Sequence, residues 1–409
     1  MASQNKLKIL NDPIYGFITI PSKQIFDIIE HPYFQRLRRI SQMGLSYLVY
    51  PGAHHTRFHH ALGCVHLMQK AVRLLRYKGV EISNEEAEAL EVAILLHDIG
   101  HGPFSHAMEH SIVENVEHEE ISLLFMQQLN EVFNQSLTLA ISIFTGNYPR
   151  KFMHQLITSQ LDMDRLDYLK RDSFYTGTTE GNINSDRLIT MLNVVNDELV
   201  IESKAIYSVE KFLVARRLMY WQVYLHKTGI VAEQLLIRVL KRAKELVSEG
   251  IECKASKALQ FFLTNKITKD NFDTEVLKTF SKLDDYDIIL AMKEWIDHDD
   301  FVLSHLSRMI INRDLLKVKL KKKKPSEEKI EKHLNAVKTT YNLSSKEAEY
   351  FVFTGEISNL AYTREKDNIN ILHKNGKISD VIKVSDQLNL KALTKTVTKY
   401  YICYPKTKD

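Results

Sequence analysis

The sequence LEVAILLHDIGHGPFSH, residues 90–106, decides the character of this chain. Its first part is apolar except for Glu91, which predicts a buried helix, and it runs directly into the pair His97-Asp98. Burying an imidazole and a carboxylate together is costly unless a partner compensates them. A divalent metal ion is the usual partner, because it needs a neutral imidazole nitrogen beside an ionised oxygen. The stretch therefore predicts a metal site at the end of a core helix.

The residues that follow this pair predict a tight turn. Residues 100–106 contain two glycines and a proline, which favour turn conformations, together with His101 and His106. The turn would present these two imidazoles to solvent beside the metal.

Two further ligands are expected on neighbouring helices. His60 begins a helical stripe of buried residues at 60, 64, 67, 71 and 75. Asp164 stands at the start of another helix, where a carboxylate is also favoured by the helix dipole. With His97 and Asp98 they form a set of two nitrogens and two oxygens from three helices, which suits Mg²⁺, Mn²⁺, Fe or Zn²⁺. The imidazoles argue against a pure Mg²⁺ or Ca²⁺ site.

Helical periodicity dominates the chain, so the expected fold is mainly α. A short β-hairpin is expected over residues 7–21 and a two-stranded element over 193–202, turned at Asn196-Asp197. Helices are expected at 60–75, 84–97, 118–133, 136–144, 152–159, 165–172, 208–247 (broken near Gly229) and 257–263.

Composition divides the chain into three predicted regions. Residues 1–315 would form the catalytic helical core with its extension, and residues 346–409 a small α+β region with alternating segments such as 368–373, 381–384 and 400–404. Between them, residues 316–345 include six lysines within 317–324. We interpret this part as a solvated linker or exposed helix, with contact to a nucleic acid as the alternative.

Overall composition excludes several classes of protein. The 409 residues are 44% hydrophobic and 26% charged, which is typical of globular proteins rather than disordered ones. Three widely spaced cysteines exclude a disulfide scaffold. The apolar runs are shorter than the ~20 residues of a membrane span, and no secretory signal is visible, so a cytoplasmic protein without membrane contact is expected.

The ordered motifs between residues 8 and 229 resemble a known family. The runs NDPIYG at 11–16, FQRLR at 34–38, RFHHALG at 57–63, HDIGHGPFSH at 97–106 and DRLDY at 164–168 are similar to those of HD-domain phosphohydrolases, whose ligand order is His…His-Asp…Asp. Within that superfamily the resemblance is closest to deoxynucleoside triphosphate triphosphohydrolases of the SAM-and-HD-domain type. It implies an HD-domain helical core that hydrolyses a deoxynucleoside triphosphate to deoxynucleoside and inorganic triphosphate.

The resemblance also assigns roles to residues. Its catalytic positions correspond to Arg57, His101, His106, Glu109 and His118, with Glu109 in place of the family's Asp. Its substrate pocket corresponds to Gln42, Arg57, Arg165, Tyr168, Asp172, Arg216 and Tyr224. Tyr224 would lie under the 2′ carbon and exclude ribose, and Arg165 stands where the family usually has Lys.

A nucleotide effector site is a further implication. Activated members bind a guanine nucleotide at a subunit interface, and the corresponding residues here are Lys8, Glu30, Gln35 and Arg38. Such a site implies a homo-oligomer. The alternative interpretation is that these are ordinary surface residues.

Other functions remain open from the sequence. An HD-type 5′-nucleotidase or phosphodiesterase would use the same metal site, and a nucleotide sensor would use the same pocket without catalysis. The remaining polar residues receive structural interpretations: His54 and His55 as solvated loop residues, and Asp162 and Asp167 as supports of a helix start.

Overall fold

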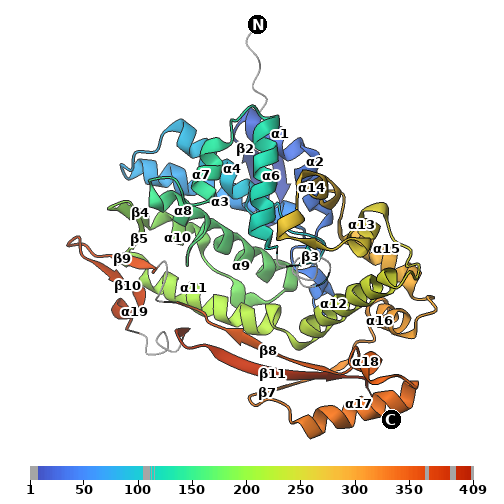
Figure 1. Cartoon of the computed structure of the whole chain (residues 1–409). Helices are drawn as coiled ribbons and strands as arrows, with labels where there is room; N and C mark the ends of the chain where they lie inside the picture. The colour runs from blue at the N-terminus through green and yellow to red at the C-terminus, as the bar shows by residue number, and fades with distance from the viewer. Residues whose placement is uncertain are drawn as a thin grey trace.

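The computed structural model describes residues 8–104, 111, 113–114, 116–363, 368–386 and 393–406. A large helical body carries a smaller β-rich part formed by the end of the chain (Figure 1). The predicted fold class is confirmed: the chain is mainly α, with an N-terminal hairpin and a C-terminal α+β part. In the described residues, no helix has the length and apolarity that crossing a membrane requires.

The described part of the chain begins with the expected hairpin. Strand β1 (Lys8–Asp12) pairs antiparallel with β2 (Gly16–Ile20), and Asp12 closes the turn because its Oδ1 accepts from the backbone N–H groups of Ile14 and Tyr15. Ser22 then caps α1 (Lys23–Glu30) by accepting from the N–H of Ile25.

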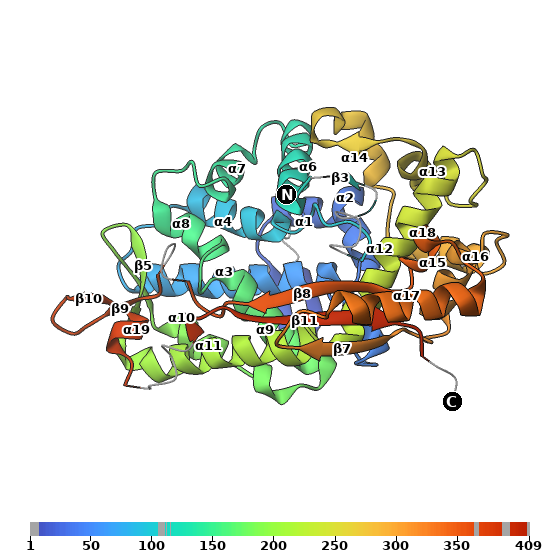
Figure 2. The same ribbon diagram turned by 60° about the horizontal axis from the view of Figure 1, so that its bottom comes forward.

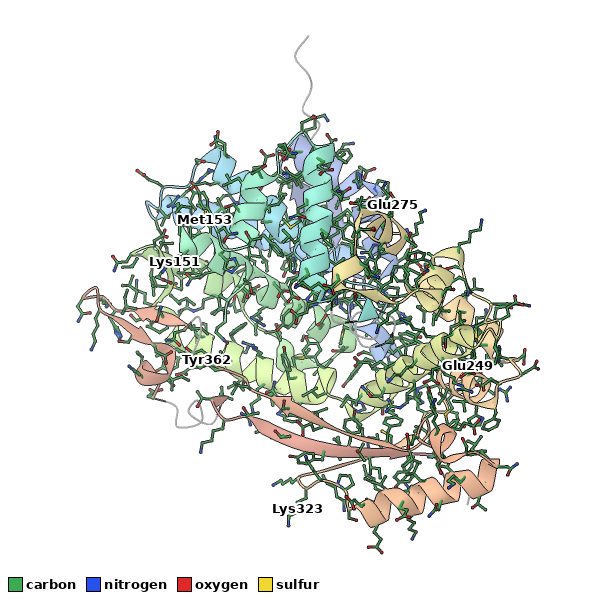
Figure 3. All side chains as sticks on the ribbon, viewed as in Figure 1. Lys151, Met153, Glu249, Glu275, Lys323 and Tyr362 are labelled. Atoms are coloured by element: carbon green, nitrogen blue, oxygen red, sulfur yellow. The ribbon has the colours of Figure 1, made fainter. Side chains whose placement is uncertain are left out.

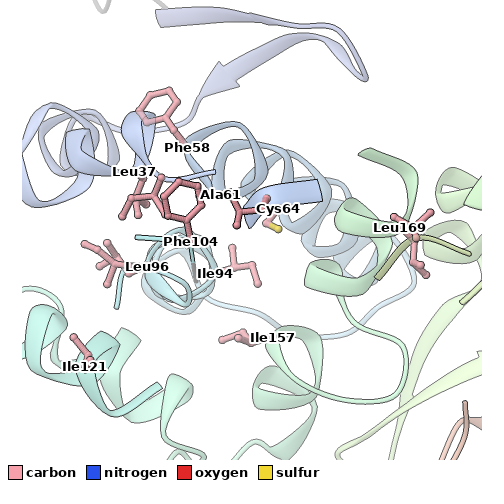
Figure 4. Close-up of a cluster of buried hydrophobic side chains, with 14 of the residues drawn as sticks. Leu37, Phe58, Ala61, Cys64, Ile94, Leu96, Phe104, Ile121, Ile157 and Leu169 are labelled. Carbon is pink, nitrogen blue, oxygen red and sulfur yellow. The ribbon is translucent and has the colours of Figure 1, made fainter. Parts of the chain in front are cut away.

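Two long helices form the centre of the core. They are α3 (Arg57–Tyr77) and α4 (Asn84–Leu96), and α4 begins with a capping box between Ser83 and Glu86. Their apolar faces meet in a cluster that includes Ala61, Cys64 and Ile94 (Figure 4). The stripe predicted from His60 to Leu75 is buried throughout. This packing fixes the C-terminal end of α4, where the His-Asp pair follows.

Further helices pack on α3 and α4, or on one another, to complete the helical body. They are α2 (Pro32–Gln35), α6 (His118–Val132), α7 (Thr138–Phe144), α8 (Lys151–Ile157), α9 (Met163–Thr176), α10 (Ser185–Thr190), α11 (Ile206–Met219), α12 (Lys227–Ser248), α13 (Lys257–Thr264), α14 (Thr274–Phe280), α15 (Asp285–Trp295) and α16 (Phe301–Ile311). A π-helical turn, Tyr220–Tyr224, separates α11 from α12, so the break precedes Gly229, which lies in the first turns of α12.

One small sheet joins the middle of the chain to its end. Strands β4 (Leu192–Val195) and β5 (Glu198–Glu202) form the expected hairpin, whose turn residues Asn196 and Asp197 have φ of 50° and 62°. Strand β9 (Asn370–Leu372) pairs parallel with β5 and antiparallel with β10 (Ile378–Asp380). A two-residue parallel pair, β3 (Val113–Glu114) with β6 (Ile267–Thr268), forms a separate link.

A second sheet lies between two helices near the C-terminus. Its order is β7 (Lys317–Lys321), β11 (Val397–Tyr404) and β8 (Phe353–Asn359). Arg238 of α12 lies over the ring of Phe353 on one side, and His333 of α17 (Glu327–Tyr341) stacks on Tyr404 on the other. The sheet therefore runs along the helical body with α17 outside it (Figures 1 and 2).

The lysine-rich segment differs from its expected form. Residues 317–321 alternate Lys-Val-Lys-Leu-Lys, and as strand β7 they expose the lysines while Val318 and Leu320 are half-buried. The interpretation as a solvated linker is wrong for this part, because pairing with β11 gives the two apolar side chains a place to pack. The lysines after the strand, such as Lys323, do extend into solvent, and α17 is a largely exposed helix (Figure 3).

A second local difference concerns residues 381–384. They form the short helix α19 (Val381–Val384) rather than an alternating segment, because the side chain of Asp380 caps the N–H of Ile382. Both small sheets pair strands from different predicted regions, and the boundaries of those regions remain predictions.

Candidate functional site

The four predicted metal ligands converge where α3, the end of α4 and the start of α9 meet. The Nε2 atom of His60 lies 3.1 Å from Oδ1 of Asp164 and 3.7 Å from Oδ2 of Asp98. The Nε2 atom of His97 lies 3.5 Å from Oδ1 of Asp98 and 3.5 Å from Oδ1 of Asp164. Residues more than 100 positions apart in the chain thus point their donor atoms at one small volume.

Both imidazoles are oriented so that Nε2 faces this volume. The Nδ1 atom of His97 is 2.7 Å from the carbonyl oxygen of Ile94, and Nδ1 of His60 is 2.7 Å from Oδ2 of Asp167. An N–H on each Nδ1 leaves a lone pair on each Nε2. Among the described residues, the buried Nε2 of His97 has no hydrogen-bond partner. A metal ion would supply that partner, so the residues present fit one.

The charges of the cluster also call for a cation. Burial would raise the pKa of Asp98, but His97 and Arg57 lower it far below its usual range. Burial likewise opposes ionisation of Asp164, but the neighbouring imidazoles of His60 and His97 lower its pKa far below its usual range. In turn, the two carboxylates outweigh the effect of burial and raise the pKa of His97. Two ionised carboxylates in a buried site attract positive charge, and a divalent ion provides it.

A buried chain of ion pairs contacts the Nδ1 side of the His60 ring, opposite the predicted metal position. Asp167 accepts from Arg171 through both oxygens, at 2.8 and 3.0 Å, and Arg171 donates onward to Asp12 of the hairpin at 2.8 Å. Gly63 makes room for this pair, because a Cβ at that position would lie 2.0 Å from Oδ1 of Asp167. Asp167 thus orients a ligand rather than the helix start, whereas Asp162 does cap α9 at the N–H of Arg165.

The turn after the His-Asp pair is anchored by residues that sequence reasoning did not select as functional. Ser122 of α6 donates to the carbonyl oxygen of His97 and accepts from the N–H of Gly100. Gly100 is required there, because a Cβ would lie 2.2 Å from the carbonyl oxygen of His118. The fully buried Arg36 donates to the carbonyl oxygens of Ile99 and His101.

A second anchor comes from the start of α15. The carboxylate of Asp285 accepts from the N–H groups of Ser41 and Phe104, each at 2.8 Å. The only sequence signal for these anchors is that polar residues such as Arg36 stand in otherwise buried positions. Their partners lie 22 to 244 positions away along the chain, so local patterns could not reveal them.

The predicted catalytic residues that the structure describes lie next to the metal-ligand cluster, beside Asp98. Arg57 forms an ion pair with Asp98, and Nε2 of His101 lies 3.4 Å from Oδ1 of the same carboxylate. The rings of His101 and His118 stack with their centroids 3.8 Å apart. Burial and the charge of Arg57 lower the pKa of His101, so this imidazole is neutral at physiological pH. His106 and Glu109 lie outside the described residues.

A cavity of about 550 Å³ opens beside these residues. We call one part of its lining the charged wall, which comprises Arg57, Asp98, His101, His118 and Asp164. We call another part the aromatic wall, which comprises Tyr168, Asp172, Tyr220 and Tyr224. Its volume is within the usual range for small-molecule sites.

The predicted substrate residues occupy this cavity with one exception. Gln42, Arg165, Tyr168, Asp172 and Tyr224 line it, as does Arg57 of the charged wall. Arg216 is absent from the described lining residues, and its guanidinium donates instead to Oε1 of Gln160 at 3.1 Å.

The aromatic wall is held together by short contacts. The ring centroids of Tyr220 and Tyr224 are 5.1 Å apart, and those of Tyr168 and Tyr224 are 6.0 Å apart. The hydroxyl of Tyr224 donates to Oδ2 of Asp172 at 2.7 Å. Burial and the neighbouring Asp172 carboxylate raise the pKa of Tyr224, so it stays a hydrogen-bond donor at neutral pH.

The interpretation of His55 as a solvated residue is wrong. Its side chain is fully buried, with Nε2 2.7 Å from Oδ1 of Asp172, and its ring stacks on Tyr175. Its neighbour His54 is exposed, as expected, and stacks on Tyr47. A polar loop sequence did not reveal that residue 55 points inward toward α9.

The four predicted effector residues lie along the start of the chain. Gln35 accepts from Nε of Arg38 at 2.8 Å and donates to the carbonyl oxygen of Ile29, next to the exposed Glu30. Lys8 lies over the ring of Phe26 in α1. These contacts place the four residues near α1 and α2, and their effector role remains a prediction.

Comparison with known proteins extends these observations. The HD domain family matches residues 57–172, and the HD associated region matches residues 183–258. A phosphohydrolase from Bacteroides thetaiotaomicron with a known crystal structure is 53% identical, and the superposition covers 98% of this chain and 100% of that one with a TM-score of 0.95.

Two curated relatives are more distant. The uncharacterized protein YwfO of Bacillus subtilis is 32% identical over 98% of this chain and 92% of its own length. A deoxynucleoside triphosphate triphosphohydrolase SAMHD1 homolog of Dictyostelium discoideum is 30% identical over 61% of this chain and 52% of its own length. The converging His and Asp side chains, the matched HD domain and the full-length relatives together show that this chain belongs to the HD-domain phosphohydrolase superfamily.

Proposed function

We propose that the protein hydrolyses deoxynucleoside triphosphates to deoxynucleoside and inorganic triphosphate. The observation that carries this proposal is the single cavity whose charged wall and aromatic wall face one ligand-sized space. A triphosphate is complementary to Arg57 and to the divalent ion that the ligands beside the first wall would hold, and a nucleoside is complementary to the rings of the second. The similarity to the SAMHD1 homolog supports the same substrate class.

The reaction replaces one oxygen on the α-phosphorus. A water molecule adds to this phosphorus, the bond to the 5′ oxygen breaks, and the oxygen of the water stays in the triphosphate. A divalent ion held by His60, His97, Asp98 and Asp164 would polarise an α-phosphoryl oxygen and increase the acidity of a bound water.

Residues of the charged wall would bind and orient the phosphates. Arg57 is a permanent cation whose guanidinium donates several hydrogen bonds, and it already lies against Asp98 at the cavity surface. The neutral His101 can donate one hydrogen bond to a phosphoryl oxygen without carrying a charge. His118, stacked on it, would lie beside the same oxygens.

The leaving 5′ oxygen needs a proton. The resemblance gives this task to His106 with Glu109 as its acidic partner, and both remain predictions. An imidazole suits the task, because its ordinary pKa of ~6.5 lets it donate a proton near neutral pH.

The aromatic wall would select the sugar. Tyr224 is fixed by its hydrogen bond to Asp172 and by contact with Tyr168 and Tyr220. A ring fixed in this way under the 2′ carbon would leave no room for a ribose hydroxyl. Deoxynucleotides are therefore the expected substrates, and Asp172 can accept a hydrogen bond from a remaining sugar hydroxyl.

The test is analysis of the products from a panel of deoxynucleotides and ribonucleotides with Mn²⁺ or Mg²⁺, with and without GTP or dATP as effector. We expect deoxynucleoside and triphosphate from deoxynucleotides and little product from ribonucleotides. In H₂¹⁸O the label should appear in the triphosphate. Release of orthophosphate or pyrophosphate, or label in the nucleoside, would contradict the proposed bond cleavage; activity on monophosphates or cyclic nucleotides would favour a nucleotidase or phosphodiesterase.

A further inference from the structure

The buried side chain of His55 belongs to no function described above. It comes from the loop before α3, yet its imidazole reaches α9 and contacts Asp172, a residue of the aromatic wall. We propose that His55 is a positioning residue that fixes the Asp172 carboxylate, together with Tyr224, so that it accepts a hydrogen bond from a sugar hydroxyl of the ligand. This inference rests on the proposed nucleotide site.

The geometry around Asp172 carries the inference. His55 Nε2 lies 2.7 Å from Oδ1, and the Tyr224 hydroxyl lies 2.7 Å from Oδ2, so each carboxylate oxygen has one donor. A carboxylate can accept about four hydrogen bonds, so each oxygen keeps a further acceptor position. Because Asp172 also lines the cavity, a donor from the ligand is the group that could use it.

The other atoms of His55 indicate a residue built to present a single N–H. Its ring stacks on Tyr175 with centroids 4.3 Å apart and an interplanar angle of 14°. Among the described residues, its buried Nδ1 has no hydrogen-bond partner. Leaving a buried nitrogen without a partner is costly, so packing alone would be served better by a phenyl ring. The contact with Asp172 is what a phenyl ring could not supply.

The backbone of the same residue positions a second cavity residue. The carbonyl oxygen of His55 accepts from the N–H of Gln42 at 3.0 Å, and Ser41 and Thr56 pair beside it. Position 55 therefore contacts Gln42 through its backbone and Asp172 through its side chain, and it lies two residues before Arg57. A side chain at position 55 is well placed to set the geometry of the sugar subsite.

The experiment compares dATP with 2′,3′-dideoxyATP, which lacks the sugar hydroxyl. Equilibrium dissociation constants are measured by calorimetry with EDTA present, so that no turnover occurs. We expect wild type to bind dATP more tightly, and His55→Phe to lose about ten-fold in affinity for dATP while its affinity for dideoxyATP stays unchanged. His55→Gln, which keeps an N–H donor, should retain most of the preference.

Two matched variants complete the design. His54→Phe changes the neighbouring exposed imidazole and should behave as wild type. In an Asp172→Ala background, His55→Phe should have no further effect on the ratio of the two affinities, because the carboxylate it positions is gone. Thermal unfolding of each variant shows whether it is folded. If His55→Phe is not, the smaller His55→Leu, which also lacks a donor, takes its place with the same expected loss.

Several outcomes would overturn the inference. They are equal binding of the two nucleotides by wild type, an equal loss of both affinities in His55→Phe, and a further loss of the ratio in the Asp172→Ala background. Failure of the proposed function looks different: wild type would still prefer dATP in the binding experiment yet release no triphosphate when Mn²⁺ is added.

Discussion

The charged wall and the aromatic wall of the cavity are built in different ways. The side chains of the charged wall come from helices α3, α6 and α9 and from the turn that follows α4. Buried polar residues such as Asp167 and Ser122 fix the positions of the ligand cluster and of this turn. The aromatic wall comes from α9 and the π-helical turn before α12, and its rings mostly hold one another. The charged side chains thus depend on buried polar contacts with distant residues, whereas the aromatic rings depend mainly on one another.

The largest expected effect comes from removing one charge of the first wall. Asp98→Asn keeps the shape but loses the negative charge whose Oδ1 faces His97 and whose Oδ2 pairs with Arg57. Turnover should fall by about 1,000-fold or more, because the ion and the phosphate contacts both depend on it. Triphosphate release and the metal content of the purified variant measure this. A variant with full metal content and normal turnover would show that the cluster is not the metal site.

A smaller effect on activity is expected from Asp167, which contacts the predicted metal ligand His60. Asp167→Asn weakens the bond that orients His60 but removes no ligand. Changes at such supporting positions lower metal affinity by about 10- to 100-fold. Titration of metal against activity should therefore show a higher half-saturating concentration with nearly full activity at saturation. If excess metal does not restore turnover, Asp167 has a direct role in the reaction.

The aromatic wall should control selectivity rather than rate. Tyr224→Ala opens space beside Asp172, so the preference for dATP over ATP should fall by about ten-fold, within the usual range for pocket shape. The control Tyr224→Phe keeps the ring and should keep most of the preference. The ratio of kcat/KM for the two nucleotides is the measurement. An unchanged ratio in Tyr224→Ala would place sugar selection elsewhere.

The smallest effect concerns a residue outside both walls. Burial, with nearby Glu88, raises the pKa of Glu91 on α4 to about 7 from an unfolded value of 4.5. The folded state then holds this proton more tightly, so its stability falls as pH rises from about 4.5 to 7.

Glu91→Gln removes that titration and should leave activity unchanged. We expect the variant to be more stable than wild type by about 1–2 kcal/mol at pH 8, after allowance for partial exposure, and about equal to it near pH 4. Thermal unfolding across this pH range measures the difference. A constant difference at all pH values would argue that packing rather than ionisation is responsible.

The sequence indicated the ligand cluster of His60, His97, Asp98 and Asp164 because most of its signals are local. His97-Asp98 stands at the end of an apolar run, and His60 lies on a buried helical stripe. Helix periodicity also indicated α3 and α4, and a turn signal between two short apolar runs indicated the hairpin at Asn196-Asp197. The aromatic wall was predicted only through resemblance, because tyrosines at helical spacing are typical of any core.

Features that depend on distant partners could not be predicted. Arg36 is buried because two carbonyl oxygens of the turn after α4 need donors, and nothing near residue 36 indicates them. His55 was assigned to solvent because its neighbours are polar. Strand β7 was missed because its partner β11 comes about 80 residues later, and α12, which also contacts the strand, is distant in the sequence as well.

The ion-pair chain from Asp12 through Arg171 to Asp167 has a practical consequence for anyone shortening the chain. None of the described residues that line the cavity belongs to the first hairpin, yet its acidic turn residue neutralises the arginine that orients a histidine of the cluster. Deleting the amino-terminal strands would leave a buried guanidinium short of one counterion. We therefore expect removal of this hairpin to weaken metal binding before it lowers the helical content of the protein.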